Sequence, residues 1–351
     1  MNKYFEYVGC IHVHTSKSDG SGSLAEVIAA AKDSELDYLM ISDHMTLAGW
    51  DERYYGWYFN DLFIIIGYEI NDRDDHHHYL AFGLEKVLPP ELNHQEYIKA
   101  VRDAGATGIV AHPFEEREPS KSLPGFPPIP WGNLDYPEIE IIEVWNMMSH
   151  WLEATTMKNR FWNVIHPRSI STFPTRSLLK WWDEVNLSRK VTGVGSVDVH
   201  ATPVKILGLY TKAIFDYKIM FKSIRTHLLS SVPITANDGL DAQKKILDLL
   251  KEGKAFISNY RRGDARGFRF WIETDGQIGT MGDTIEGRSG HLHVHLPLKG
   301  TCRVIRDGQV IHTTNCRTLT IPIDAGVYRV EVERGRRGWI YSNHIKLVAK
   351  H

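Results

Sequence analysis

The sequence contains few cysteines and no long apolar run, and these absences exclude several classes of protein. Its 351 residues include three cysteines, Cys10, Cys302 and Cys316, without a CxxC spacing. A disulfide framework is therefore not expected, and three reduced thiols are the simpler interpretation. No apolar stretch approaches the roughly 20 residues of a membrane helix, and the first ten residues lack the apolar core of a signal peptide. These features predict a cytoplasmic protein that does not associate with membranes.

The chain also lacks a strong net charge. Lysine and arginine together number 41 and aspartate and glutamate 43, which gives a formal net charge of −2. Two short basic clusters, within residues 261–266 and 334–337, are typical of solvated turns. Tight binding to duplex nucleic acid is therefore not expected.

The first two-thirds of the chain alternates short apolar runs with helical patterns. Ser23 and Glu26 form a capping box, which predicts that a helix begins directly after Ser23. Further helical patterns cover residues 95–105 and 177–185. Predicted strands cover residues 7–11, 37–42, 62–69, 78–83, 107–111, 139–145 and 190–195. Such alternation predicts an α/β fold with a parallel sheet or barrel, and more than five strands favour a barrel.

Two stretches depart from this alternation. Residues 115–137 are rich in proline and glycine and show no period, which predicts a long loop of the kind that often serves as a lid or binding element. From about residue 263 the sequence turns into strands joined by short turns, with a hairpin signal at Asp307-Gly308. We therefore predict two domains, a barrel over residues 1–262 and a small all-β sandwich over residues 263–351.

Metal-binding side chains recur where the predicted strands end. In an α/β barrel these ends converge on one face, where active sites are built. Residues two apart in an extended strand point the same way, which would place His12 beside His14 and Asp198 beside His200. Glycines in the first loop would let Asp19 fold back toward them. A lone buried histidine is more often a hydrogen-bonded core residue, but this recurrence favours a metal site; its members are His12, His14, Asp19, His44, Glu69, His78, His112, Asp198 and His200.

The donor types restrict the metal without identifying it. Carboxylate and imidazole together suit Zn²⁺, Mn²⁺ or Fe²⁺. A second histidine pattern, His291, His293 and His295, also alternates along a predicted strand. No acidic partner lies at matching spacing there, so a solvated sheet face is the preferred interpretation.

At this point the motifs resemble those of the PHP (polymerase and histidinol phosphatase) family of metal-dependent phosphoesterases. The resemblance covers about residues 7–262 and rests on HxH followed by Asp19, on SDH at 42–44, on Glu69, on a lone histidine, on AHP at 111–113 and on DVH at 198–200. It implies a distorted, TIM-like (β/α)7 barrel with two or three divalent metal ions on its C-terminal face.

The resemblance also implies roles for individual residues. A first metal would be held by His12, His14, Glu69 and Asp198. Glu69 would bridge to a second metal held by His78 and His112. A third would be held by Asp19, His44 and His200. His78 is chosen because it directly precedes the apolar run, with His76 and His77 as alternatives. The expected catalytic residues are His12, Glu69, Asp198 and His200.

Further residues are candidates for supporting roles. Lys17 and Arg117 are candidate phosphate contacts, although solvated surface charge is the more common role for such residues. Asp43 is expected to orient a ligand imidazole. Asn146 either donates a hydrogen bond at its strand end or caps a turn.

The predicted function is hydrolysis of small phosphate esters. Three divalent ions, three carboxylates and one hydroxide leave a site charge of about +2, which suits a dianionic phosphate monoester attacked by a metal-bridging hydroxide. Three alternatives remain: a metal-dependent hydrolase of esters, carbamates or amides, a phosphatase of short oligonucleotides or nucleotide bisphosphates, and a non-catalytic scaffold stabilised by metal. The substrate, the metal and the oligomeric state are not predicted.

Overall fold

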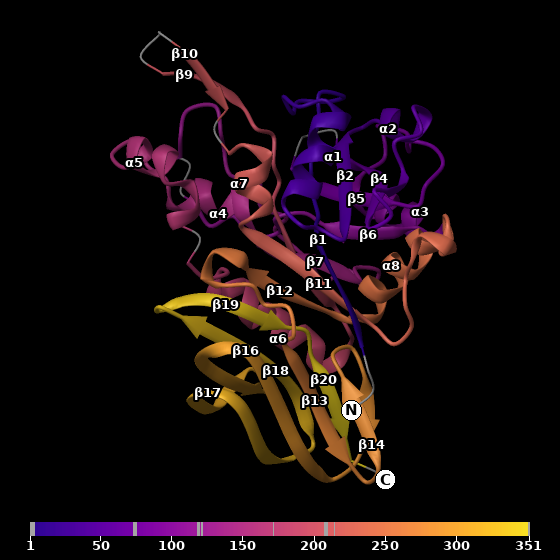
Figure 1. The fold of residues 1–351 in the computed structure, drawn as a ribbon, viewed down its shortest axis with the longest axis vertical. Coiled ribbons are helices and arrows are strands. Elements are labelled where there is room, and N and C mark those ends of the chain that lie inside the picture. The colour runs from indigo at the N-terminus through magenta and orange to yellow at the C-terminus, as the bar shows by residue number, and fades with distance from the viewer. Residues whose placement is uncertain are drawn as a thin grey trace.

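A computed structural model describes residues 4–349 except 73–75, 118, 119, 121, 171, 207–209 and 214. The fold is mixed α/β, with a largely parallel N-terminal sheet and an antiparallel C-terminal region (Figure 1). Among the described residues, no helix is both long and apolar enough to cross a membrane.

The N-terminal sheet combines parallel and antiparallel pairs. Its strands are β1 (Phe5–Cys10), β2 (Tyr38–His44), β3 (Gly56–Tyr58), β4 (Leu62–Asn71), β5 (His78–Phe82), β6 (Thr107–Val110), β7 (Ile141–Asn146) and β8 (Thr192–Ser196). β1, β2 and β4 pair in parallel, as do β6, β7 and β8. β5 is antiparallel to both β4 and β6, and β3 is antiparallel to β4. The expected parallel series is therefore interrupted at β5, because residues 72–77 are too few for the helical crossover that parallel strands need.

The segment that follows β8 lies beside the segment that follows β1. Val13 pairs in parallel with Val199. The amide of His14 donates to the carbonyl of Val199 at 3.0 Å, and that of Val197 donates to the carbonyl of Ile11 at 3.1 Å. These bonds bring the two segments that follow β1 and β8 side by side.

The described α-helices all lie between residues 24 and 252. They are α1 (Leu24–Asp33), α2 (Ala48–Asp51), α3 (His94–Asp103), α4 (Met147–Ala154), α5 (Arg160–Ile165), α6 (Arg176–Ser188), α7 (Tyr217–Phe221) and α8 (Asp241–Glu252), with 3₁₀ turns at Pro167–Ser169, Ala236–Asp238 and Tyr260–Arg262. α1 begins at the predicted capping box, in which Ser23 and Glu26 exchange hydrogen bonds. The apolar face of α1 is buried, as its sequence period predicts. Residues 115–137 contain no regular strand or α-helix in their described part.

The remaining strands are mostly antiparallel. They are β9 (Pro203–Ile206), β10 (Tyr210–Ala213), β11 (Ile224–Ser230), β12 (Ala255–Asn259), β13 (Arg269–Thr274), β14 (Gln277–Thr280), β15 (Thr284–Glu286), β16 (Ser289–Arg306), β17 (Gln309–Asp324), β18 (Gly326–Arg334), β19 (Arg337–Ser342) and β20 (Ile345–Val348). Asp307 and Gly308 both have positive φ between β16 and β17, which is the backbone that the predicted hairpin turn requires. β15 and β20 form a parallel pair.

One sheet runs from the first part of the chain into the second. β11 pairs with β1, β12 pairs with β11, and β19 pairs with β12, all antiparallel. Leu229 and Phe256, from β11 and β12, belong to the same apolar cluster as Phe270, Val294 and Trp339 of the C-terminal region. The C-terminal strands therefore share part of their core with the N-terminal part.

A buried polar network reinforces this junction. His227 on β11 contacts Glu6 on β1 through Nδ1 at 2.8 Å and Ser258 on β12 through Nε2 at 2.8 Å. Glu6 also accepts hydrogen bonds from Arg269 and from the amide of Gly267, at 2.7 and 2.9 Å. Ser258 is fully buried, so this Glu–His–Ser arrangement serves packing rather than nucleophilic chemistry.

The second histidine pattern lies on an open sheet face. His291 and His295 are exposed and His293 is half-buried, while Leu292 and Val294 between them are buried. This alternation agrees with the solvated sheet face favoured by the sequence.

Candidate metal centre

Nine acid and imidazole side chains gather where β1, β2, β4, β6 and β8 end and where β5 begins. Three groups of potential metal donors form there, and His14 belongs to two of them. The groups come from segments spread over residues 12–200, as the sequence pattern predicts.

The first group combines His12, His14, Glu69 and Asp198. Oε2 of Glu69 lies 2.9 Å from Nε2 of His12 and 3.1 Å from Nε2 of His14. Oδ1 of Asp198 lies 3.3 and 3.5 Å from the same two nitrogens. Four donors arranged tetrahedrally at about 2.1 Å from an ion would be about 3.4 Å apart, so the spacing of these atoms fits one cation.

Unsatisfied donors support this fit. Within the described residues, both ring nitrogens of His14 and Oε1 of Glu69 are buried without a hydrogen-bond partner. Carboxylate oxygens lie near the two nitrogens of His14, and imidazole nitrogens lie near Oε1 of Glu69, but not in hydrogen-bonding geometry. Buried polar atoms are rarely left without a partner. A cation in this group would satisfy Nε2 of His14, and a second cation would satisfy Oε1 of Glu69.

The second group lies on the other oxygen of Glu69. Nδ1 of His78 is 2.9 Å from Oε1 of Glu69, and Nε2 of His112 is 3.8 Å from it. The two oxygens of Glu69 thus face two different sets of imidazoles. A carboxylate in this position can bridge two ions.

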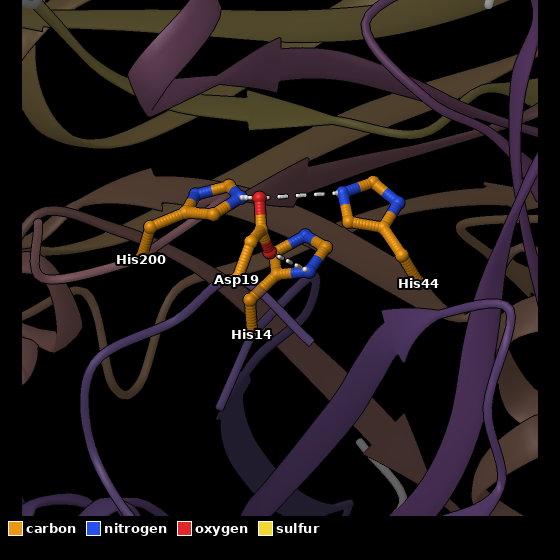
Figure 2. A group of neighbouring side chains, drawn as sticks. All are labelled: His14, Asp19, His44 and His200. Carbon is orange, nitrogen blue, oxygen red and sulfur yellow. Dashed lines mark ion pairs between the residues drawn. The ribbon is translucent and has the colours of Figure 1, made fainter. Parts of the chain in front are cut away.

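The third group is more exposed. Figure 2 shows Asp19 between His14, His44 and His200. Oδ2 of Asp19 lies 3.2 Å from Nε2 of His200 and 3.8 Å from Nε2 of His44, and Oδ1 lies 3.5 Å from Nδ1 of His14. The side chain of Asp19 is 55% exposed, whereas those of His12 and His14 are fully buried.

The backbone that presents these side chains differs from the expected one. β1 ends at Cys10, and His12 adopts a left-handed conformation with φ of 69°. Asp198 and His112 also have positive φ, 51° and 29°. The expected extended pairs His12/His14 and Asp198/His200 were therefore the wrong backbone explanation. A positive φ in a non-glycine residue costs conformational free energy, and such residues cluster at functional sites. Here this backbone conformation directs the side chains of three donors toward the centre, just beyond the ends of their strands.

Glycines do shape the first loop, through close approach. A Cβ on Gly20 would lie 2.5 Å from the backbone carbonyl group of His14, and one on Gly22 would lie 2.5 Å from the ring of Tyr217. The hydroxyl of Tyr217 donates to the carbonyl of His14 at 2.9 Å and accepts from the amide of Gly22 at 3.1 Å. These contacts hold the loop that carries Asp19 against α7.

Sequence reasoning missed Glu143, which is buried in β7. Its Oε1 lies 2.7 Å from Nδ1 of His12, and its Oε2 accepts from the amide of His112 at 2.8 Å and from Asn146 at 2.7 Å. Glu143 thereby orients two proposed ligands that come from different strands. The signal was a single charged residue inside the apolar run IIEVW.

Three other supporting residues also differ from or extend the expectation. Asp43 accepts from the amide and hydroxyl of Thr15 and from the hydroxyl of Ser18, so it fixes the first loop and does not orient an imidazole. Asn71 takes that orienting role, with its Oδ1 2.7 Å from Nδ1 of His44. Asn146 does both things considered for it, because it caps α4 and also donates to Glu143.

The candidate phosphate contacts already have partners. Lys17 forms an ion pair with Glu52. Arg117 pairs with Glu115 at 2.8 Å and donates to the carbonyls of Phe126 and Pro127, both at 3.0 Å. These contacts use both cations to hold loops. Of the three consecutive histidines, His78 faces Glu69, whereas His77 contacts Asp72 and His76 is exposed.

The charges within the centre depend on one another. Burial opposes ionisation of Glu69, but the imidazoles of His12, His44 and His78 outweigh it and hold the pKa of Glu69 well below its usual range. The pKa of Asp198 is lowered in the same way, chiefly by His12. Burial disfavours a charged His14, yet Asp198 and Glu69 raise its pKa to about 9. The pocket therefore favours ionised carboxylates together with positive charge, which a divalent cation would supply.

Comparison with solved structures finds only distant likenesses. A two-domain protein from Bacteroides vulgatus, described as containing a predicted PHP-like metal-dependent phosphoesterase, is 13% identical, with 97% of this chain and 95% of that chain covered and a TM-score of 0.47. PsfC from Pseudomonas syringae is 15% identical, with 70% and 98% covered and a TM-score of 0.38. An amidohydrolase from Chromobacterium violaceum is 12% identical, with 55% and 87% covered and a TM-score of 0.31. All three TM-scores are below 0.5.

A family model gives a direct result. No curated protein matches the chain, but residues 11–110 match the model of the PHP domain. The match includes His12, His14, Asp19, His44, Glu69 and His78, whereas His112, Asp198 and His200 lie beyond it. The resemblance drawn from the motifs is confirmed over residues 11–110, the segment that matches the PHP domain.

Proposed function

We propose that this protein is a metal-dependent phosphoesterase that hydrolyses small phosphate monoesters. The observation that carries the proposal is the position of Glu69, whose two oxygens face two separate groups of buried donors. Two or three divalent ions, of zinc, manganese or iron, would be held by the three groups described above. When bound, such ions supply hydroxide at neutral pH and neutralise charge on the phosphoryl oxygens.

The protein's own residues would position these ions and the substrate. His12, Glu69 and Asp198 fix the buried part of the centre, and Glu143 orients His12 from behind. Asp19, His44 and His200 are the more exposed members. The substrate would therefore approach from their side, where His200 and Asp19 complete the centre.

We propose two further features of the fold. The hydrogen bonds between residues 11–14 and 197–199 support closure of the N-terminal sheet into a distorted seven-stranded barrel. Residues 1–262 and 263–351 would be two domains, the second an accessory β-sandwich. The shared apolar cluster and the β12–β19 pairing imply that the two domains are tightly joined.

A paired assay tests the function. The purified protein, supplied with Mn²⁺, Zn²⁺ or Fe²⁺, is offered a chromogenic aryl phosphate and an aryl carbamate. Turnover of the phosphate that is lost in His12→Ala, with the folded structure retained, is the expected result. Turnover of the carbamate alone would replace the proposal with the ester, carbamate or amide hydrolase. No turnover of either substrate, together with unfolding of His12→Ala, would point to a structural metal.

A further inference from the structure

The turn between β4 and β5 carries a second group of donors on its opposite side. Glu69, Asn71 and His78 share one face of this antiparallel pair, in which Asn71 lies opposite His78. Neighbouring residues along a strand point to opposite faces. Asp72 and His77 therefore turn away from the metal centre, and His94, at the start of α3, joins them there.

The donors of this second group converge. One donor atom each from Asp72, His77 and His94 lies within 4.8 Å of the other two. Nδ1 of His77 is hydrogen-bonded to Oδ2 of Asp72. The rings of His77 and His94 are stacked with centroids 4.1 Å apart and an interplanar angle of 19°. The β4–β5 turn and the start of α3 thus bring one carboxylate and two imidazoles close together.

Surrounding contacts fix the orientation of these side chains. Oδ1 of Asp72 accepts from the amides of His76 and His77, at 2.7 and 3.2 Å. The hydroxyl of Tyr136 lies 3.0 Å from Nε2 of His94. Trp131 packs edge-on against the His77 ring, with centroids 5.2 Å apart. Such outer contacts preorganise a donor set before a ligand binds.

The group is accessible as well as ordered. The side chain of Asp72 is 10% exposed and that of His77 is 21% exposed, and His94 is also half-buried. A solvated ion can therefore reach donors whose positions are already set. Two imidazoles and one carboxylate form a three-ligand zinc set that leaves a fourth position for water.

We propose that Asp72, His77 and His94 bind a divalent cation of the zinc type at a site separate from the candidate metal centre described above, which is called the PHP centre. An ion there would join the β4–β5 turn to the start of α3, and through Tyr136 to the long loop before β7. Its role would be to brace these segments, and it would take no part in hydrolysis. The proposal does not depend on the proposed function, because none of its three residues belongs to the three groups of the PHP centre.

Zinc counting tests the proposal. The full-length protein and its variants are stripped of metal, titrated with Zn²⁺ alone and analysed for bound zinc per chain after removal of the excess. His94→Gln and His77→Gln should each bind about one equivalent less than the unmodified protein. His76→Gln is the matched control, because His76 is exposed and adjacent but outside the group, and it should bind the full number.

Further outcomes keep the test decisive. If either glutamine variant fails to fold, Asp72→Asn replaces it, since the amide retains the oxygen that accepts from the two backbone amides. Equal zinc counts in all folded variants would overturn the proposal and leave Asp72–His77 as an ordinary hydrogen-bonded pair. A reduced count in a protein without phosphatase activity would support this site while removing the proposed function. Phosphatase activity retained in His94→Gln would support the assigned bracing role.

Discussion

The side chain of Glu143, which orients two of the proposed ligands, is as deeply buried as those ligands. Glu143 is 1% exposed and contacts His12, the amide of His112 and Asn146 at 2.7 to 2.8 Å. Because one carboxylate organises two proposed ligands, its charge and shape both affect the centre. A substitution at Glu143 should therefore change the affinity for metal, although Glu143 is not itself a proposed ligand.

Replacing Glu143 by glutamine should weaken metal binding about 10- to 100-fold, the usual effect of losing an outer partner of a ligand. The amide keeps the shape of the carboxylate but loses its charge and one acceptor oxygen. Competition with a metal chelator measures the change in dissociation constant. Glu140→Gln, an exposed change three residues earlier, should leave it unaltered. Unchanged affinity in Glu143→Gln would remove its orienting role.

A second prediction at the residue scale concerns the pH dependence of stability that arises from His150. Burial lowers the pKa of His150 from 6.5 to about 4. The imidazole of His150 therefore stays neutral in the folded protein, whereas in the unfolded chain it takes up a proton as the pH falls below 6.5. The associated stability is fully present above pH 6.5 and is lost as the pH falls to about 4.

His150→Gln should remove this dependence. Between pH 7 and pH 4, the free energy of unfolding of the metal-free protein should fall by up to about 3 kcal/mol more than that of the variant. Urea denaturation at several pH values measures both slopes. His166→Gln changes an exposed histidine and should keep the slope of the unmodified protein. Parallel slopes in the protein and in His150→Gln would contradict the prediction.

The sequence predicted the role of a site residue only where that residue stood out from its neighbours. Imidazoles and carboxylates at strand ends stood out against apolar runs, and the structure brings all nine of them together. Glu143 was missed because a single charged residue within a strand does not indicate whether its side chain points toward the site. Lys17 and Arg117 could not be judged from sequence because their partners, Glu52 and Glu115, depend on loop conformation.

At the scale of elements, helix α6 is fastened to the C-terminal strands by a buried ion pair. Arg329 on β18 donates to both oxygens of Asp183, at 2.5 and 2.8 Å. His344, just before β20, lies 2.8 Å from Oδ1 of Asp183. All three side chains are less than 10% exposed. Removing Asp183 would leave the buried Arg329 with Glu331, 2.6 Å away, but without the carboxylate that accepts two of its hydrogen bonds.

Asp183→Asn should destabilise the protein by about 3 to 5 kcal/mol, which is typical when one member of a buried pair is removed. Chemical denaturation followed by tryptophan fluorescence measures the change, because the ring of Trp182 packs against His344 with centroids 4.6 Å apart. The neighbouring exposed change Glu184→Gln should cost less than about 1 kcal/mol. Equal stabilities for the two variants would show that this pair contributes little.

Element type was easier to predict than element pairing. Capping boxes and apolar periods located α1 and the main strands because both signals are local. The antiparallel β5 follows from the short connection after β4, a signal in the sequence that the prediction of a parallel series did not use. The pairing of β12 with β19 joins segments far apart in the chain, and no local pattern predicts it.

At the scale of the whole molecule, the two parts of the chain share a sheet and an apolar cluster. A chain that ends at residue 262 would expose the edge of β12 and the side chains of Leu229 and Phe256. Exposed strand edges promote aggregation. The two proposed domains should therefore not fold independently.

Residues 1–262 expressed alone should be insoluble or should unfold at lower denaturant concentration than the full chain. The full chain should unfold in one transition, with fluorescence and circular dichroism changing together. A soluble fragment with the stability and metal content of the full protein would contradict this. Two separate transitions of the full chain would contradict it as well.

The uneven burial of the three donor groups has a consequence for metal exchange. Glu69 is 1% exposed, while the side chain of Asp19, in the loop after β1, is 55% exposed. An ion bound to Asp19 would leave in mild chelator long before ions bound to Glu69. The protein would then pass through a partly loaded form, and the ambient concentration of free metal would set how many molecules are complete.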